Sequence, residues 1–96
     1  MFVIEDEEHC ETMGRFDSQE LALARLEDLA KVAWDHEPNR APCTEWRNCE
    51  RRYVIREYDV SQVPWKLLKR IPVLSVSANG VSWSVPRRPE RTPPIP

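Results

Sequence analysis

The sequence predicts a two-layer α+β domain in which one amphipathic helix packs on a mainly antiparallel sheet, in the approximate order β-β-α-β-β-β. Three observations predict this class. A capped segment with an apolar stripe begins after Asp17, an Asn79-Gly80 pair separates two alternating stretches, and further β-branched and aromatic runs flank them. The chain has 96 residues, 41% hydrophobic and 31% charged, which is the composition of a single soluble domain.

The first two strands are short. Residues 2–4 are apolar and partly β-branched, and residues 10–16 form a second candidate strand. The acidic residues 5–8 would connect the two strands. Gly14 inside the second strand indicates a weak point or a bulge.

The helix is expected to begin after Asp17, because Asp17 and Glu20 form a capping-box pattern. Apolar residues then recur every three or four positions and form one stripe: Ala22, Leu23, Leu26, Leu29, Ala30 and Ala33. Pro38 disfavours helical geometry at the residue before it, so the helix should end near Trp34 or Asp35.

The following region contains a long loop and a strand. Residues 35–50 have no clear periodicity and predict a loop, whereas residues 51–59 alternate and predict a strand. Residues 60–72 hold two prolines and predict an irregular crossing. We expect its Trp65, Leu67 and Leu68 side chains to pack against the domain.

A hairpin is predicted over residues 73–85, since Asn-Gly favours a two-residue type I′ turn. Counting outward from that turn pairs Ala78 with Val81, Val76 with Trp83, and Leu74 with Val85. Serines would pair on the opposite face. Trp83 is therefore expected to be buried against Val76 and the helix.

The composition changes at the end of the chain. Residues 86–96 contain five prolines and three arginines, which is typical of a polyproline II or disordered tail. The predicted domain therefore covers residues 1–85, with residues 86–96 as its tail.

Charge is divided between the two parts of the chain. Residues 1–37 hold eleven acidic and three basic side chains, a net charge of −8, and residues 38–96 hold five and eleven, a net charge of +6. Such a division indicates either charged surfaces for partners or two parts that neutralise each other. We expect mutual neutralisation, because all surfaces of so small a domain lie close together.

The three cysteines, Cys10, Cys43 and Cys49, leave three alternatives open. His36, Cys43 and Cys49 could hold a structural zinc ion, but five residues between the two cysteines is wider than the usual spacing. A disulfide between Cys43 and Cys49 is the second alternative. The third, which we favour, is buried thiols that pack as small hydrophobic groups, with no cofactor.

Several function classes are excluded or disfavoured. With two glycines in the chain, neither a phosphate-binding loop nor a dinucleotide fingerprint can be written. No serine has a glycine two residues away on both sides, as a nucleophile elbow requires, so we expect no enzyme. The N-terminus lacks the basic start and apolar run of a secretory signal, and no apolar run is long enough to cross a bilayer. We therefore expect a cytoplasmic protein without membrane contact.

Binding is the function that the residue types favour. Tryptophan and arginine dominate interface hot spots, and these types gather at candidate binding positions: Arg40, Trp46, Arg47, Arg51, Arg52 and Arg56. The prediction is a small non-enzymatic binding or regulatory module whose partner is another protein. One alternative is a nucleic-acid-binding protein that uses the basic and aromatic Arg47–Arg56 region. Others are an acidic inhibitor of a nucleic-acid-handling protein, acting through Glu5–Glu11, and a zinc-stabilised domain.

Overall fold

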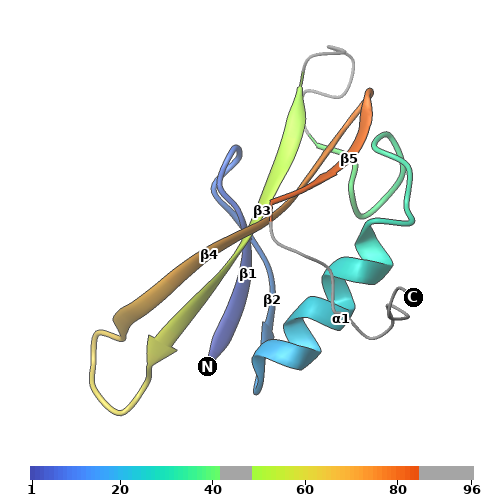
Figure 1. The fold of residues 1–96 in the computed structure, drawn as a ribbon. Coiled ribbons are helices and arrows are strands. Elements are labelled where there is room, and N and C mark those ends of the chain that lie inside the picture. The colour runs from blue at the N-terminus through green and yellow to red at the C-terminus, as the bar shows by residue number, and fades with distance from the viewer. Residues whose placement is uncertain (42–48, 85–96) are drawn as a thin grey trace, which may run out of the picture.

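A computed structural model describes residues 1–41 and 49–84 of the chain. One helix packs on a five-stranded antiparallel sheet, which confirms the α+β class (Figure 1). The elements are β1 (Phe2–Asp6), β2 (Glu11–Phe16), α1 (Gln19–Leu29), β3 (Glu50–Asp59), β4 (Lys66–Ser77) and β5 (Gly80–Trp83). The strand order in the sheet is β2-β1-β3-β4-β5.

The pairing of β1 with β2 contains the irregularity that Gly14 predicted. Ile4 pairs with Gly14, but Glu5 pairs with Thr12, so Met13 is an extra residue in β2. A Cβ atom at Gly14 would lie 3.0 Å from the ring of Phe16. A larger residue here would have to displace the Phe16 ring, which favours glycine at this close approach of backbone and ring.

The helix differs from the prediction at both ends. Ser18, not Asp17, is the N-cap, and its Oγ accepts a hydrogen bond from the Leu21 N–H at 3.1 Å. The helix ends at Leu29, five residues before Trp34. The buried Asn39 side chain explains this end, because its Nδ2 donates to the carbonyls of Leu29 and Val32, both at 2.8 Å. A side chain distant in sequence thus satisfies the carbonyls that helix termination leaves open.

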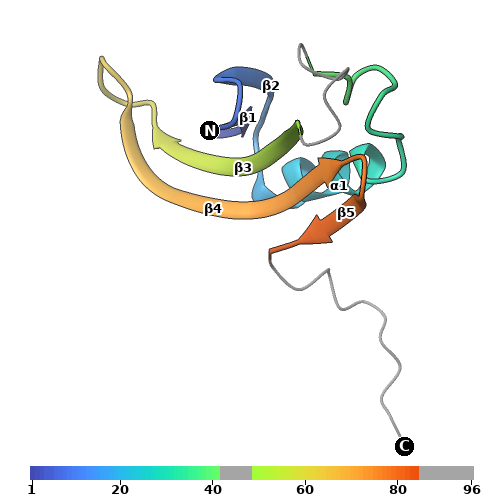
Figure 2. The same cartoon turned by 90° about the horizontal axis from the view of Figure 1, so that it is seen from above.

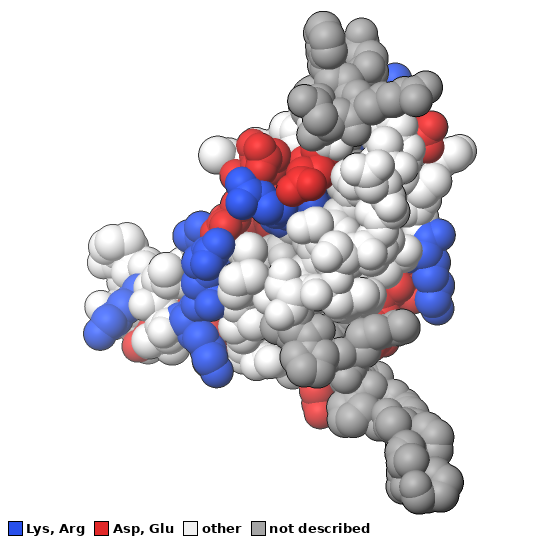
Figure 3. All heavy atoms as spheres, turned by 45° about the horizontal axis from the view of Figure 1, so that its top comes forward, with Lys and Arg blue, Asp and Glu red and all other residues white. Residues whose placement is uncertain are grey.

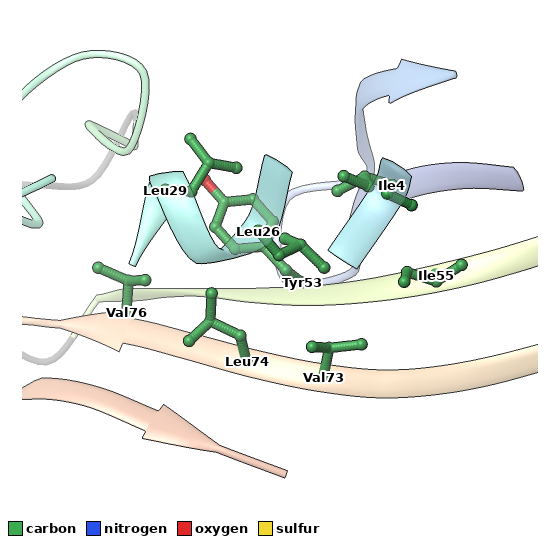
Figure 4. Close-up of a cluster of buried hydrophobic side chains, with 9 residues drawn as sticks. Ile4, Leu26, Leu29, Tyr53, Ile55, Val73, Leu74 and Val76 are labelled. Atoms are coloured by element: carbon green, nitrogen blue, oxygen red, sulfur yellow. The ribbon is translucent and has the colours of Figure 1, made fainter. Parts of the chain in front are cut away.

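The core lies between α1 and one face of the sheet (Figure 4). Ile4 and Ile55 are direct partners on β1 and β3, and both are fully buried. Their neighbours in the cluster come from the helix and from strands β3 and β4: Ala22, Leu26, Leu29, Tyr53, Val73, Leu74 and Val76. The apolar stripe of the helix and the alternation of β3 therefore meet as the sequence patterns require.

Strands β3 and β4 form a long hairpin that curves as one unit (Figure 2). The prediction of an irregular crossing over residues 60–72 is wrong for Lys66–Pro72, which belong to β4 and pair with β3. A register shift lies next to Pro72, because Tyr53 pairs with Leu74 and Val54 with Pro72, and a bulge accommodates a residue that cannot donate to the ladder. Leu67 and Leu68 are exposed rather than packed.

The hairpin of β4 and β5 forms with a register two residues from the predicted one. Val76 pairs with Val81 and Leu74 with Trp83, around a turn at Ala78 and Asn79. A type I′ turn needs positive φ at both central residues, whereas Asn79 keeps a negative φ and Gly80, with φ +113°, follows the turn. A shift of two residues leaves each side chain on the predicted face of the sheet. Trp83 therefore still packs on the core, but it is partly exposed and lies opposite Leu74.

Two predictions fall on residues that the structure does not describe. The partner predicted for Leu74, Val85, and the proline-rich tail 86–96 lie outside the described residues, as does the centre of the predicted loop at 42–48. Within residues 1–41 and 49–84, no helix has the length and apolar character that crossing a membrane demands.

Candidate functional site

Arg51 is the centre of a buried polar network. Its side chain is 5% exposed, and its donors reach three elements of the fold. Nε donates to the Asn39 carbonyl at 2.8 Å, Nη2 to the Arg40 carbonyl at 2.7 Å, and Nη1 to Asp6 Oδ2 at 2.9 Å and to Glu11. Arg51 therefore ties the segment after α1 to β1 and β2, and little of its side chain is exposed to a partner.

The same network fixes two protonation states. Burial alone would lower the pKa of Arg51, but hydrogen bonds to Glu11 and Asp6 outweigh burial and raise it. Burial raises the pKa of Tyr53 to about 12, and the Tyr53 hydroxyl donates to Asn39 Oδ1 at 2.7 Å. The guanidinium stays charged and the phenol stays neutral, so both keep their hydrogen bonds near neutral pH.

The exposed Arg52 and Arg70 and the half-buried Arg56 pair with acidic residues near the start of the chain. Arg52 contacts Glu8 at 2.6 Å, and Arg56 Nη2 contacts Glu7 at 2.8 Å. Arg70 donates two hydrogen bonds to Glu7. Acidic and basic side chains accordingly lie side by side on the surface (Figure 3).

These pairs confirm mutual neutralisation for this part of the molecule. Two of the alternative functions depend on charged side chains that are left free for a partner. The acidic side chains of residues 5–11 and the described basic side chains of residues 47–56 instead pair largely with each other. Arg56 also lies within 3.3 Å of Glu5, and Glu11 is held by Arg51. The candidate binding residues Arg52 and Arg56 are thus placed at the surface but already occupied by carboxylates.

We expect Glu7 to make the domain less stable as the pH falls from about 4.5 to about 2. Arg70 and Arg56 lower the pKa of Glu7 from 4.5 to about 2. The unfolded chain therefore binds this proton at a higher pH than the folded chain does, and the stabilisation is complete above about pH 4.5 and lost below about pH 2. Urea unfolding midpoints at about pH 6 and about pH 3 measure the loss. Between these two pH values Glu7→Gln should lose less stability than wild type. Glu37→Gln, which replaces an exposed carboxylate, should lose as much stability as wild type. Equal losses in all three proteins would contradict the role of Glu7.

The remaining candidate binding residues belong to the segment after the helix. Arg40 is exposed and lines an open hollow of about 590 Å³ together with Glu11 and Glu37. Trp46 and Arg47 lie outside the described residues. Of the candidate binding residues that the structure describes, Arg40 and the buried Arg51 line this hollow.

The candidate zinc ligands are not brought together among the described residues. His36 is exposed and contacts its neighbour Asp35 at 3.1 Å, whereas the Cys49 sulfur lies 3.4 Å from Nε2 of His9. Cys43 lies outside the described residues. No group of three or more histidine, cysteine, aspartate or glutamate side chains in the described ranges could hold a metal ion.

The expectation of packed thiols is wrong for two of the three cysteines. Cys10 is a free and exposed thiol, and Cys49 is disulfide-bonded. The contact of Cys49 with His9 joins residues 40 positions apart. Only the pairing of β1 with β3 brings these positions together, and no spacing in the sequence signals it.

A second site that the sequence did not indicate is the far end of the β3–β4 hairpin. We call residues 59–70 the hairpin arm. The arm extends beyond the other strands (Figure 1), and every residue from 60 to 70 is exposed. Five of the seven exposed large hydrophobic residues of the described ranges belong to it: Val60, Val63, Trp65, Leu67 and Leu68.

The base of the arm is held by aromatic contacts. The rings of Trp65 and Tyr58 lie 5.8 Å apart with a tilt of 52°, and the guanidinium of Arg15 lies 5.2 Å from the Trp65 ring centre. Tilted ring pairs and cation–π contacts are both favourable. Trp65 is therefore partly covered, and it holds the loop of the arm against β2 and β3.

Comparison with known proteins finds no match for this chain. No protein-family model, no curated protein and no solved structure matches it. The function is therefore inferred from the geometry of the described residues.

Proposed function

We propose that this protein is a small non-enzymatic binding module that engages another protein through the hairpin arm. The observation that carries the proposal is the concentration of exposed apolar side chains on residues 60–68. Val63 is 92% exposed and Leu68 is 52% exposed. Exposed apolar side chains that gather on one segment are typical of an interaction site, because leaving them in water is unfavourable.

The open edge of β4 supports a particular mode of binding. β5 pairs with β4 only from Leu74 to Ser77, so Lys66–Pro72 has β3 on one side and no partner strand among the described residues on the other. An open edge presents backbone donors and acceptors, to which an extended segment of a partner can add as a further strand. Pro72 would limit such pairing to the part of β4 within the arm.

The charge of this edge favours an acidic partner segment. Lys66 and Lys69 are exposed on β4, whereas the acidic residues opposite them, Asp59 and Glu57, lie on β3, one strand further from an added segment. Direct cross-strand neighbours contribute most to pairing, and like charges there are unfavourable. The same rule disfavours pairing of β4 with β4 of a second copy. The partner we propose is an extended protein segment with acidic and apolar residues.

Selection from a displayed library of short random peptides against the immobilised full chain tests this proposal. We expect enrichment of peptides that combine acidic and apolar residues. A selected peptide should bind the Lys66→Glu, Lys69→Glu double variant at least about tenfold more weakly. It should bind Lys31→Glu, which reverses an exposed lysine after the helix, as tightly as wild type.

Backbone modification of the selected peptide tests strand addition itself. Alternate amides of an added strand face the sheet, so N-methylation of one alternate set should abolish binding and methylation of the other set should not. Peptides that bind the double variant unchanged, or no enrichment at all, would contradict the proposal. Oligonucleotide binding that falls steeply with salt would instead support the nucleic-acid alternative.

A further inference from the structure

Strand β3 shows which side chains pair with β4 in the hairpin arm, where the two strands run side by side (Figure 2). Three residues of β3 lie opposite this part of β4: Glu57 opposite Lys69, Tyr58 opposite Leu67, and Asp59 opposite Lys66. Each lysine thus faces an acidic residue, and the leucine between them faces an aromatic one. Opposite charges across two strands are favourable, and an aromatic ring buries apolar surface against its neighbour. An acidic, an aromatic and an acidic residue in succession therefore match this stretch of β4.

A bulge places the two lysines on the same face of the sheet. Lys66 and Lys69 are three positions apart, so on a regular strand they would point to opposite faces. The register shift after Glu57 leaves Leu68 as an extra residue of β4. Glu57 and Asp59 are two positions apart on β3 and share a face. The lysines opposite them therefore share that face too.

The residue between the lysines faces the other way. Leu67 lies opposite Tyr58, and the Tyr58 ring lies 5.8 Å from the ring of Trp65. Leu67 is 44% exposed and Trp65 is 37% exposed, so both keep surface that a partner can cover. The open edge of β4 within the arm thus combines positive charge on one face of the sheet with apolar surface on the other.

We propose that the partner segment repeats the pattern of β3, with two acidic residues two positions apart and an aromatic or large aliphatic residue between them. This inference rests on the proposed function, because it specifies the segment that adds to the open edge of β4. The acidic side chains lie beside Lys66 and Lys69 in the complex, and the apolar side chain between them lies beside Leu67. The pattern is nearly symmetric, so it fits an added strand of either direction.

The order of the partner residues matters as much as their composition. Successive side chains of a strand point to opposite faces, so moving an acidic residue by one position carries it to the apolar face. There it would lie beside Leu67 and lose water without gaining an opposite charge. A segment with the same residues in another order should therefore bind more weakly.

Two designed peptides of identical composition test this order. Both have acetyl and amide ends and two threonines on each side of a central triplet. The triplet is Glu, Tyr, Asp in the first peptide and Glu, Asp, Tyr in the second. Nuclear magnetic resonance titration of the nitrogen-15-labelled full chain measures weak affinities and identifies the amides that respond. We expect the first peptide to shift the amides of residues 66–71 and to bind at least about fivefold more tightly than the second.

Exchange of charge tests whether the acidic residues lie directly beside the lysines. A third peptide, with Lys, Tyr, Lys as its triplet, should bind the Lys66→Glu, Lys69→Glu double variant more tightly than wild type. The first peptide should show the reverse preference. Lys31→Glu, which reverses an exposed lysine after the helix, should bind every peptide as wild type does.

The outcomes separate this pattern from the proposed function. Equal affinities of the first and second peptides at the arm would overturn the pattern and leave strand addition standing. The pattern is also wrong if neither designed peptide binds although library selection yields peptides that bind the arm. If neither designed nor selected peptides bind the arm, both the pattern and the proposed function are wrong.

Discussion

Replacing Arg51 with methionine should destabilise the domain by about 3–5 kcal/mol, a large part of the stability of a domain of this size. The substitution keeps an apolar side chain of similar length but removes every donor of the guanidinium. Asp6 would remain buried without its charged partner, and the carbonyls of Asn39 and Arg40 would lose theirs. Breaking a buried ion pair by removing one partner is costly because the other charge stays desolvated.

Arg52→Met is the matched control for this expectation. Arg52 is the next residue along β3, its side chain is 55% exposed, and its partner Glu8 is also accessible to water. Exposed ion pairs contribute little to stability, so the urea midpoint of Arg52→Met should stay close to that of wild type. Equal midpoints for the Arg51 and Arg52 variants would show that the guanidinium of Arg51 does not hold the fold together.

Truncation of Leu26 should produce the second large effect. Leu26 is 0% exposed and belongs to the same core cluster as Ile4, Leu29 and the buried residues of the sheet. Leu26→Ala removes three buried carbon atoms and leaves a cavity, and such substitutions cost about 2–5 kcal/mol. Thermal and urea unfolding followed by circular dichroism should both show the loss.

Leu21→Ala provides the same chemical change on the opposite side of the helix. Leu21 is 55% exposed, so its truncation should alter stability by less than about 0.5 kcal/mol. Both positions lie within α1, so the two substitutions change helix propensity in the same way. The difference between their losses of stability therefore measures the effect of burial. A Leu21 effect as large as that of Leu26 would show that the helix packs through a different face.

The elements of the fold could be predicted from local patterns, but their ends could not. The helix stripe and the alternation of β3 follow from side-chain period alone. The helix end depends on Asn39, which lies ten residues after Leu29 and caps it through a tertiary contact. The β4–β5 register depends on whether Asn79 adopts a positive φ. The Asn79-Gly80 pair alone does not determine which of the two turn types forms.

The site was harder to predict because neighbouring arginines have opposite roles. Arg51 and Arg52 are adjacent, yet the pleat turns one inward and the other outward. Assigning them requires the identity of the strand beside β3, and β1 lies about 50 positions earlier in the chain. The contact of His9 with Cys49 has the same origin. The hairpin arm was missed because apolar residues at 63–68 were expected to be covered, although the single helix covers a different part of the sheet.

The position of the hairpin arm has a consequence for how this sequence can change over time. The buried network and the helix contacts lie at the other end of the sheet. Apart from Trp65 and Arg70, which contact Tyr58 and Glu7, substitutions on residues 60–70 therefore exchange exposed side chains for exposed side chains. Such changes usually alter stability little, and selection removes mainly variants that fall below the stability needed for function. Recognition could therefore be altered at the arm while the rest of the domain stays folded, which would let one scaffold acquire new partners in small steps.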